Sequence, residues 1–315
     1  NLLSKYNWII KENQKVILSP DSDGLLCGLL MSNFYNWDIV GYYDGKILIL
    51  KDGLKAKDCI FLDMEIFRKD IRSLGHHMIM FNKDKLVNNW GDFADCIQPN
   101  NIRGYDSKNY FNLKYPFGSI HLLLGIIGSK KEIKIETSAI CPLLYTDGTF
   151  KNLFNFPENC LSWLNYLGAD NKKSPLNTIF YNEHYTISSL MLALRDFFTK
   201  LKILNGGKKG ADKLKISNTR GIPVNLVKKN NLYEFDLNTK DTGEKFLNLL
   251  SELTGWEYKG NKWLWDSFSL YKFEKGMIKP SNARYNVLMG KNPLSLAMTS
   301  GLAIEYTLET PNKLP

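Results

Sequence analysis

The stretch that most constrains the fold is Lys15–Met31, KVILSPDSDGLLCGLLM. Its apolar run Val16–Leu18 ends at a Ser-Pro turn, which carries Asp21 and Asp23 before Gly24 opens a second apolar run. Proline and glycine mark the turn, and the leucines after it recur at helical spacing. We therefore predict a strand, an acidic turn and a helix, the repeating unit of a parallel α/β sheet.

The acidic turn has two interpretations. In a parallel α/β sheet the turn at the carboxyl end of a strand is where ligands bind, and the carboxylates of Asp21 and Asp23 repel each other unless a cation lies between them. Oxygen ligands at this spacing suit Mg²⁺ or Mn²⁺. The alternative is a structural turn in which an aspartate caps the following helix.

Three later stretches add candidate polar residues. Cys59–Asp63 (CIFLD) is an apolar run that ends in an aspartate, His76 and His77 follow Gly75, and Leu143–Phe150 (LLYTDGTF) is an apolar run that ends in Thr146, Asp147 and Gly148. In this order, and after the first acidic turn, the series resembles the motifs of the DHH phosphoesterase superfamily. This superfamily includes RecJ-type single-strand exonucleases and phosphodiesterases of small nucleotides. The resemblance covers roughly the first half of the chain.

The resemblance implies that the chain is an enzyme, a phosphodiester hydrolase that uses two metal ions. In this interpretation Asp23, Asp63, His76 and Asp147 hold one ion, and Asp21 and Asp63 hold the other, with Asp63 bridging. His77 contacts the phosphate of the substrate. An imidazole ligand favours Mn²⁺ over Mg²⁺. Two further stretches are similar to the family pattern between its third and fourth motifs, namely Ile97–Asn100 and the helix expected over Pro116–Gly128.

The chain departs from the family pattern at two positions. Family members usually carry an Asp or a His ahead of the first aspartate pair, where this chain has Ser19 or Ile17, and the third motif begins with Asp where this chain has Gly75. These changes leave three alternatives open: a weaker metal site, a site for a single ion, or a relative that has lost catalysis and retains binding.

Composition bears on the partner and the compartment. The chain has 315 residues and a formal net charge of +9, which favours a polyanionic partner such as nucleic acid. Its five cysteines form no C-x-x-C pair, so we expect reduced core cysteines in a cytoplasmic protein. No apolar run is long enough to span a bilayer, so we expect no membrane partner.

The alternation of apolar runs and helical patterns predicts an α/β protein with a mostly parallel sheet, flanking helices, a helical connector and a smaller C-terminal α/β domain. We predict domains over 1–150 (DHH-like, metal-binding, catalytic), 151–210 (connector and linker) and 211–315 (substrate-binding). Expected strands are Asp38–Tyr43, Lys46–Leu50, Tyr233–Leu237 and Asn261–Phe268, and Asp147 can join Asp21 and Asp63 if Cys141–Tyr145 is also a strand. Expected helices are Glu65–Leu74, His121–Ile127, Pro157–Leu167, Tyr185–Leu204 and Thr242–Leu253. The glycine-rich, basic Asn205–Lys215 is interpreted as a solvated linker, with a phosphate-contacting loop as the alternative.

The C-terminal region offers fewer signals. Ser281–Gly301, with Arg284, Lys291 and Ser300, is our candidate for a substrate-facing segment. The aromatic residues are assigned to the core, with base stacking as the alternative; they are Trp256, Tyr258, Trp263, Trp265 and Tyr271. Three functions remain in competition: a nuclease of single-stranded nucleic acid, a phosphodiesterase of dinucleotides or short oligonucleotides, and a non-catalytic relative that binds nucleic acid or a protein.

Overall fold

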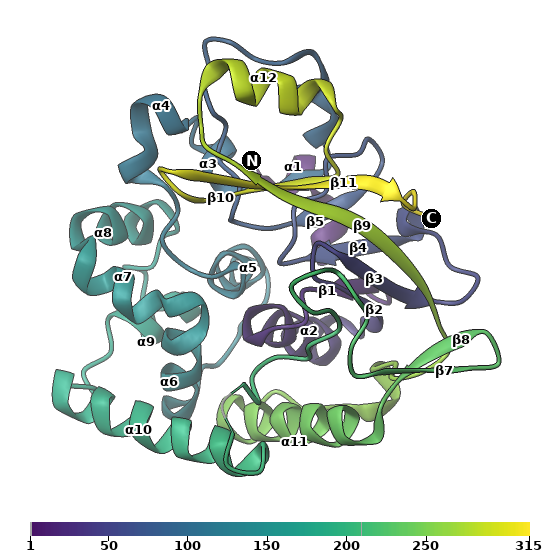
Figure 1. Cartoon of the computed structure of the whole chain (residues 1–315). Helices are drawn as coiled ribbons and strands as arrows, with labels where there is room; N and C mark the ends of the chain where they lie inside the picture. Colours follow the sequence, from purple (N-terminus) through teal and green to yellow (C-terminus); the bar gives the residue numbers. More distant parts are fainter. Residues whose placement is uncertain (1, 209) are drawn as a thin grey trace.

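A mixed β-sheet runs through the molecule, with helices packed around it (Figure 1). The structure is a computed structural model and describes residues 2–208 and 210–315. The strands are β1 Lys15–Leu18, β2 Asp38–Tyr43, β3 Ile47–Lys51, β4 Cys59–Leu62, β5 Arg72–Leu74, β6 Cys96–Ile97, β7 Leu226–Lys229, β8 Leu232–Phe235, β9 Phe268–Ile278, β10 Ser295–Ser300 and β11 Ala303–Pro311. The helices are α1 Leu2–Lys5, α2 Ser22–Tyr35, α3 Pro99–Ile102, α4 Ser107–Tyr110, α5 Ser119–Gly128, α6 Thr137–Tyr145, α7 Thr149–Asn155, α8 Pro157–Tyr166, α9 Pro175–Phe180, α10 Ile187–Leu204, α11 Leu237–Thr254 and α12 Asn282–Gly290.

The order of the strands is β10-β11-β9-β3-β2-β1-β4-β5-β6, with β8 paired to β9 and β7 to β8. Strands β2, β1, β4, β5 and β6 pair in parallel, whereas the pairs β2–β3, β3–β9, β9–β11 and β10–β11 are antiparallel. The α/β class is confirmed. The sheet is parallel only in its N-terminal part, because the connections β2–β3 and β10–β11 are hairpins.

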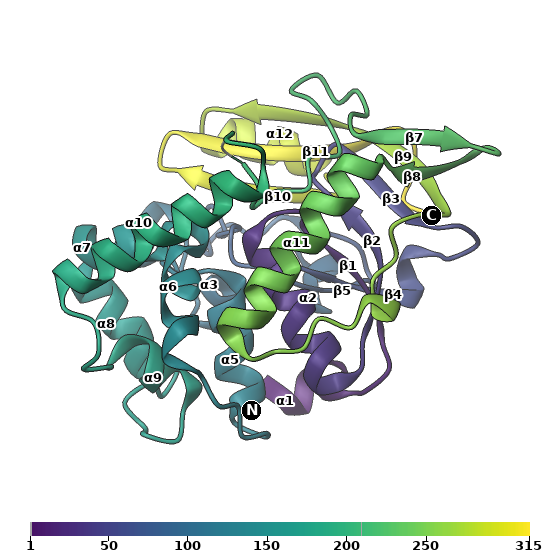
Figure 2. The same ribbon diagram turned by 90° about the horizontal axis from the view of Figure 1, so that it is seen from below.

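Helix α2 is the central helix of the fold. The carboxylate of Asp21 accepts a hydrogen bond from Gly24 N and caps its first turn, and Asn36 ends it in the left-handed conformation. Residues on every side of α2 are buried, among them its leucines, Cys27 and Met31, since the helix packs between β1, β4, α5 and α11 (Figure 2). A helix that is apolar all round belongs in the interior of a protein, so the strand, turn and helix predicted from the sequence are confirmed.

Strands from both predicted domains join in one sheet. Tyr271 of β9 pairs with Leu48 of β3, and the rings of Phe273 and Tyr43 pack edge to face with centroids 5.8 Å apart. This contact continues the β-sheet from residues 38–51 into residues 268–311. The domain boundaries at 150 and 210 stay a prediction.

The basic segment Asn205–Lys215 is only partly a solvated linker. Ala211, Asp212 and Leu214 are buried, and Leu214 N donates to Pro20 O over 2.8 Å. The side chain of Leu214 packs against α11 at Gly243, where a Cβ would lie 2.6 Å from it. Its apolar residues therefore draw this part of the segment into the core. Lys209 lies outside the described residues.

Three predicted elements are wrong. Cys141–Tyr145 belongs to helix α6, in which every residue from Ala139 to Leu144 is buried, and a short, fully buried apolar run does not distinguish strand from helix. Within Glu65–Leu74, residues Arg72–Leu74 form strand β5, and no helix is present there. In place of the strand Asn261–Phe268, a 3₁₀ turn (Gly260–Lys262) leads to β9, which begins only at Phe268.

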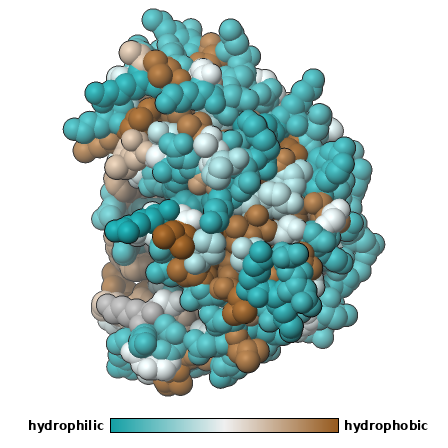
Figure 3. Space-filling view, turned by 45° about the vertical axis from the view of Figure 1, so that its right-hand side comes forward, coloured by the Kyte–Doolittle hydropathy of each residue, from teal (hydrophilic) through white to brown (hydrophobic). Residues whose placement is uncertain are grey.

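Other predictions agree with the structure. The strands at Asp38–Tyr43 and Lys46–Leu50 are β2 and β3, and helices α5, α8, α10 and α11 lie where expected, within a few residues. Trp256, Trp263 and Trp265 are core residues, and all five cysteines are free and buried. Among the described residues, no helix combines the length and apolarity that a bilayer span requires. The face in Figure 3 is mostly hydrophilic, with small apolar patches between polar side chains.

Candidate metal centre and cleft

The candidate site lies where parallel strands end. Because β1, β4 and β5 run in parallel, their carboxyl ends meet at one edge of the sheet. Asp21 follows β1, Asp63 comes directly after β4, and His76 follows β5. Strand pairing therefore brings together three residues that are far apart in the sequence.

Four side chains form a group that could hold a metal ion. One ligand atom from each of Asp63, His76, His77 and Asp147 lies within 4.8 Å of the corresponding atoms of the others. Asp147 Oδ2 is at the centre, 2.8 Å from His76 Nε2 and 3.8 Å from His77 Nε2. Asp147 reaches the group from a 3₁₀ turn (Thr146–Gly148) after α6, where its own φ is 50°. Asp147 therefore reaches the group from the end of a helix and not from the end of a strand.

Ser119 connects two members of this group. Its Oγ donates to Asp63 Oδ1 over 2.8 Å and lies 2.8 Å from His76 Nδ1. Since a hydroxyl has a single hydrogen, which Asp63 accepts, His76 donates to Ser119 from Nδ1. This arrangement fixes the ring and directs Nε2 of His76 toward Asp147. Ser119 was not predicted from the sequence. The one signal for it there is its position at the start of an apolar helix.

Asp23 is completely buried and binds the amino end of α5. Its carboxylate accepts hydrogen bonds from Ser119 N at 2.5 Å and from Ile120 N at 2.9 Å. Gly118 allows this approach, because a Cβ there would lie 2.9 Å from Asp23 Oδ2. Asp23 Oδ2 is still 3.9 Å from His76 Nδ1, so Asp23 borders the four-residue group while it anchors α5.

Asp21 takes the capping role that was the alternative interpretation of the acidic turn. Its Oδ1 accepts from Gly24 N at 3.3 Å, and Gly24 is required because a Cβ there would lie 2.1 Å from Ser19 O. Asp21 also lines the cleft in front of the metal group, as do Ser19 and Asp63. Asp21 therefore borders the cleft while it caps α2.

Burial and crowding govern the charges of the group. Burial, followed by the charges of neighbouring aspartates, raises the pKa of Asp23 and Asp63 well above the ordinary value, and it raises that of Asp21 as well. Burial alone would also raise the pKa of Asp147, but the hydrogen bond from His76 and the two imidazoles hold it well below its usual range. Burial, and then His76, lower the pKa of His77. A cation would remove the electrostatic cost of ionising these carboxyls.

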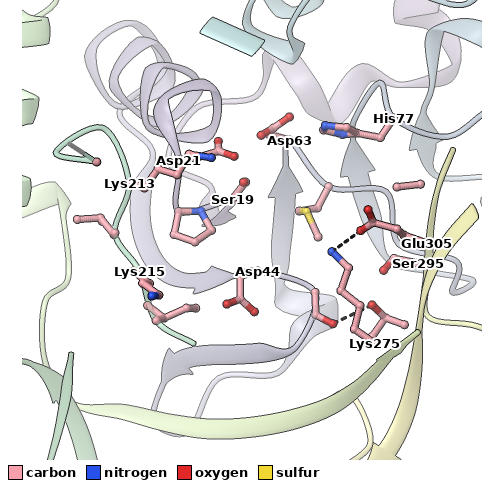
Figure 4. A pocket seen from close by; sticks show the side chains of 18 of the residues that line it. Ser19, Asp21, Asp44, Asp63, His77, Lys213, Lys215, Lys275, Ser295 and Glu305 are labelled. Atoms are coloured by element: carbon pink, nitrogen blue, oxygen red, sulfur yellow. Dashed lines mark hydrogen bonds and ion pairs between the residues drawn. The ribbon is translucent and has the colours of Figure 1, made fainter. Parts of the chain in front are cut away.

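A cleft of about 800 Å³ opens in front of the group (Figure 4). Asp21, Asp63 and His77 lie along the edge of the sheet. Segment 213–216 lies beside the acidic turn, since Leu214 N donates to Pro20 O, and the rest of the lining comes from the start of α11 and strands β9, β10 and β11. These parts carry Lys213, Lys215 and Lys275, of which Lys275 forms an ion pair with Glu305 over 2.8 Å.

The predicted substrate-binding residues lie elsewhere. Arg284 is exposed on α12 and Lys291 is exposed just after it, and neither lines the cleft. Strand β10 of the same segment does line it, through Ser295–Ala297 and Thr299. A further lysine was missed by sequence reasoning: burial lowers the pKa of Lys114 to about 8, against the opposing charges of Glu65 and Asp147.

Comparison of the chain with protein-family models, curated proteins and solved structures gives no match.

Proposed function

We propose that the chain is a divalent-metal-dependent phosphodiester hydrolase, with single-stranded nucleic acid as its substrate. The observation that carries this proposal is the convergence of Asp63, His76, His77 and Asp147 at the edge of a parallel sheet. Asp63 and His77 of this group line a cleft that Lys213, Lys215 and Lys275 also line. A metal group near cationic side chains suits a substrate that contains phosphate.

The donor atoms fit a transition ion. Two imidazole nitrogens and two carboxylates suit Mn²⁺ better than Mg²⁺, which prefers oxygen ligands and water. One ion would be held by the four-residue group. We place a second ion between Asp21 and Asp63, because both line the cleft and burial disfavours the charge on both. In this arrangement His77 is a ligand as well as a neighbour of the phosphate.

The protein's own residues prepare this chemistry. Bound divalent ions supply an activated water and neutralise charge on the phosphoryl oxygens. Ser119 holds Asp63 and His76 in place, so the ligands need little rearrangement. Asp23 fixes α5, which carries Ser119. Lys213 and Lys215 attract the phosphates of the substrate from the segment beside the acidic turn.

A smaller substrate is the second candidate. The cleft volume of about 800 Å³ lies within the usual range for small-ligand sites. Among the described residues that line the cleft, Tyr306 is the only Phe, Trp or Tyr, whereas single-strand binders stack several bases on aromatic rings. Both features favour a dinucleotide or a short oligonucleotide. The net charge of +9 favours a longer strand.

Cleavage with Mn²⁺ separates the candidates. Purified protein is incubated with end-labelled single-stranded DNA and RNA, and separately with linear and cyclic dinucleotides. We expect Mn²⁺-dependent shortening of the strands and its loss in Asp63→Asn. Cleavage of dinucleotides alone would favour the second candidate. If the wild type binds Mn²⁺ and cleaves nothing, the chain is a binding relative without catalysis.

A further inference from the structure

Glu65 is a buried carboxylate beside the metal group that the proposed chemistry does not yet use. Its side chain is only 3% exposed, and it lines the cleft two residues after Asp63. Its Oε1 accepts from Met78 N over 2.8 Å, which fixes the carboxylate. The other oxygen, Oε2, lies 3.9 Å from Nδ1 of His77.

Gly75 leaves room for this carboxylate. A Cβ at position 75 would lie 2.6 Å from Cδ and 2.8 Å from Oε2 of Glu65. The backbone does not require glycine there, because Gly75 is not among the residues with positive φ. The position is therefore kept free of a side chain by the space that Glu65 occupies.

The rings of His76 and His77 are oriented in the same way relative to their polar neighbours. Nε2 of His76 and Nε2 of His77 both face Asp147 Oδ2, at 2.8 and 3.8 Å. On the opposite side of each ring, Nδ1 of His76 faces Ser119 Oγ, and Nδ1 of His77 faces Glu65 Oε2. Each imidazole thus has one nitrogen toward the candidate ion and one toward a hydrogen-bond acceptor.

We propose that Glu65 is the positioning carboxylate of His77. It accepts the hydrogen of Nδ1 and so leaves the lone pair of Nε2 for a divalent cation, as carboxylates next to ligating histidines do. The present 3.9 Å is longer than a hydrogen bond. The ring of His77, whose side chain is 33% exposed, turns toward Glu65 when Nε2 takes a ligand. This inference rests on the proposed metal-dependent function.

Glu65→Gln is the first test. The amide keeps the size of the side chain and an oxygen for Met78 N, and it presents a donor instead of an acceptor to His77. We expect Mn²⁺ affinity, measured by electron paramagnetic resonance, to fall by about 10-fold to 100-fold. Nitrogen NMR of the histidine rings should show His77 moving away from the Nδ1–H tautomer. Glu305→Gln, a cleft carboxylate paired with Lys275, is the matched control and should change neither reading.

The second test moves the carboxylate from position 65 to position 75. Gly75→Asp alone should overlap Glu65 and weaken Mn²⁺ binding, and Glu65→Ala alone should weaken it as well. The double variant Glu65→Ala/Gly75→Asp places a carboxylate in the same space from a different backbone position, so we expect it to bind Mn²⁺ more tightly than either single variant. Thermal melts of all three check that the fold is retained.

Two results would overturn the role of Glu65: an unchanged tautomer and Mn²⁺ affinity in Glu65→Gln, or a double variant no better than the worse single variant. Failure of the proposed function has a different signature. In that case the wild type binds Mn²⁺ but hydrolyses no phosphodiester, while the Glu65 variants still change Mn²⁺ affinity.

Discussion

Two groups of residues at the cleft, the sheet-edge wall and the lysine wall, carry charge in different ways. The sheet-edge wall carries Asp63, with Asp23 next to the metal group; both are buried, and their carboxylates accept hydrogen bonds from residues of α5. The lysine wall consists of Lys213 and Lys215, which extend from an irregular segment beside the acidic turn, and Lys275, which is about one-third exposed. Buried charges need a fixed counter-charge, whereas exposed charges act over a distance and are screened by salt. We infer that the first wall holds the cation and the second attracts the substrate.

The largest expected effect comes from removing a ligand on the sheet-edge wall. Asp63→Asn keeps the size of the side chain and a hydrogen-bond acceptor for Ser119, but it removes the negative charge shared by both candidate ions. Changes beside a metal site already cost about 10-fold to 100-fold, so we expect more than about a 100-fold loss of Mn²⁺-dependent hydrolysis. The measurement is kcat/KM on a single-stranded oligonucleotide. Activity within a factor of a few of wild type would contradict the site.

A pH series tests the buried charges on the same wall. The folded-state pKa of Asp23 and Asp63 is raised, so their contribution to stability is full below the unfolded pKa and is lost as pH rises through the folded pKa. Mn²⁺ supplies the missing counter-charge, and saturation at 100 times Kd adds about 2.7 kcal/mol. We therefore expect the increase in melting temperature with Mn²⁺ to grow from about pH 5 to about pH 8. An equal increase in melting temperature at the two ends of this pH range would be evidence against buried carboxylates as Mn²⁺ ligands.

Substitutions in the lysine wall should have a smaller effect than loss of a metal ligand. Lys213→Ala/Lys215→Ala should reduce the affinity for a single strand and lower the slope of log affinity against log salt by about 0.7 for each phosphate that no longer meets a lysine. Binding titrations at several salt concentrations, with the metal present and Asp63→Asn to prevent cleavage, measure this slope. Lys172→Ala/Lys173→Ala, two exposed lysines remote from the cleft, is the control. An unchanged slope in the cleft variant would remove the segment from the substrate path.

The smallest effect is expected at Ser19. It lines the cleft two residues before Asp21, so a carboxylate there would reach the ion that Asp21 and Asp63 share. We expect Ser19→Asp to lower the Mn²⁺ concentration for half-maximal cleavage and to preserve hydrolysis. Loss of activity in this variant, together with full activity in Asp21→Ala, would show that the first acidic turn is placed wrongly.

The same contrast explains what the sequence could predict. Asp63 follows a short apolar run, and local pattern was sufficient to place it at the end of a strand. His76 was singled out as one of a histidine pair, but the strand before it, β5, is only three residues long and was predicted as part of a helix. Ser119 and Glu65 act through contacts across the fold, which no local spacing reveals. Asp147 was singled out on condition that Cys141–Tyr145 is a strand, because a short apolar run fits a strand or a helix equally well.

The lysine wall was harder to predict for a physical reason. Lys213 and Lys215 lie in a segment whose glycines and lysines are typical of a linker, and burial of Leu214 against α11 together with the hydrogen bond from Leu214 N to Pro20 O holds it beside the acidic turn. Arg284 and Lys291 were chosen in a candidate substrate-facing segment, yet both are exposed and neither lines the cleft. Tertiary packing decides which lysines face a substrate, and charge patterning alone does not.

The most direct test of the account is a Mn²⁺ titration followed by electron paramagnetic resonance. Wild type, Asp63→Asn, His76→Ala and the control Glu305→Gln are titrated under the same conditions, and free Mn²⁺ is measured. The account predicts saturable binding in wild type and in the control, and its loss in the two ligand variants. Absence of saturable binding in wild type up to millimolar Mn²⁺, or equal binding in all four proteins, would contradict it.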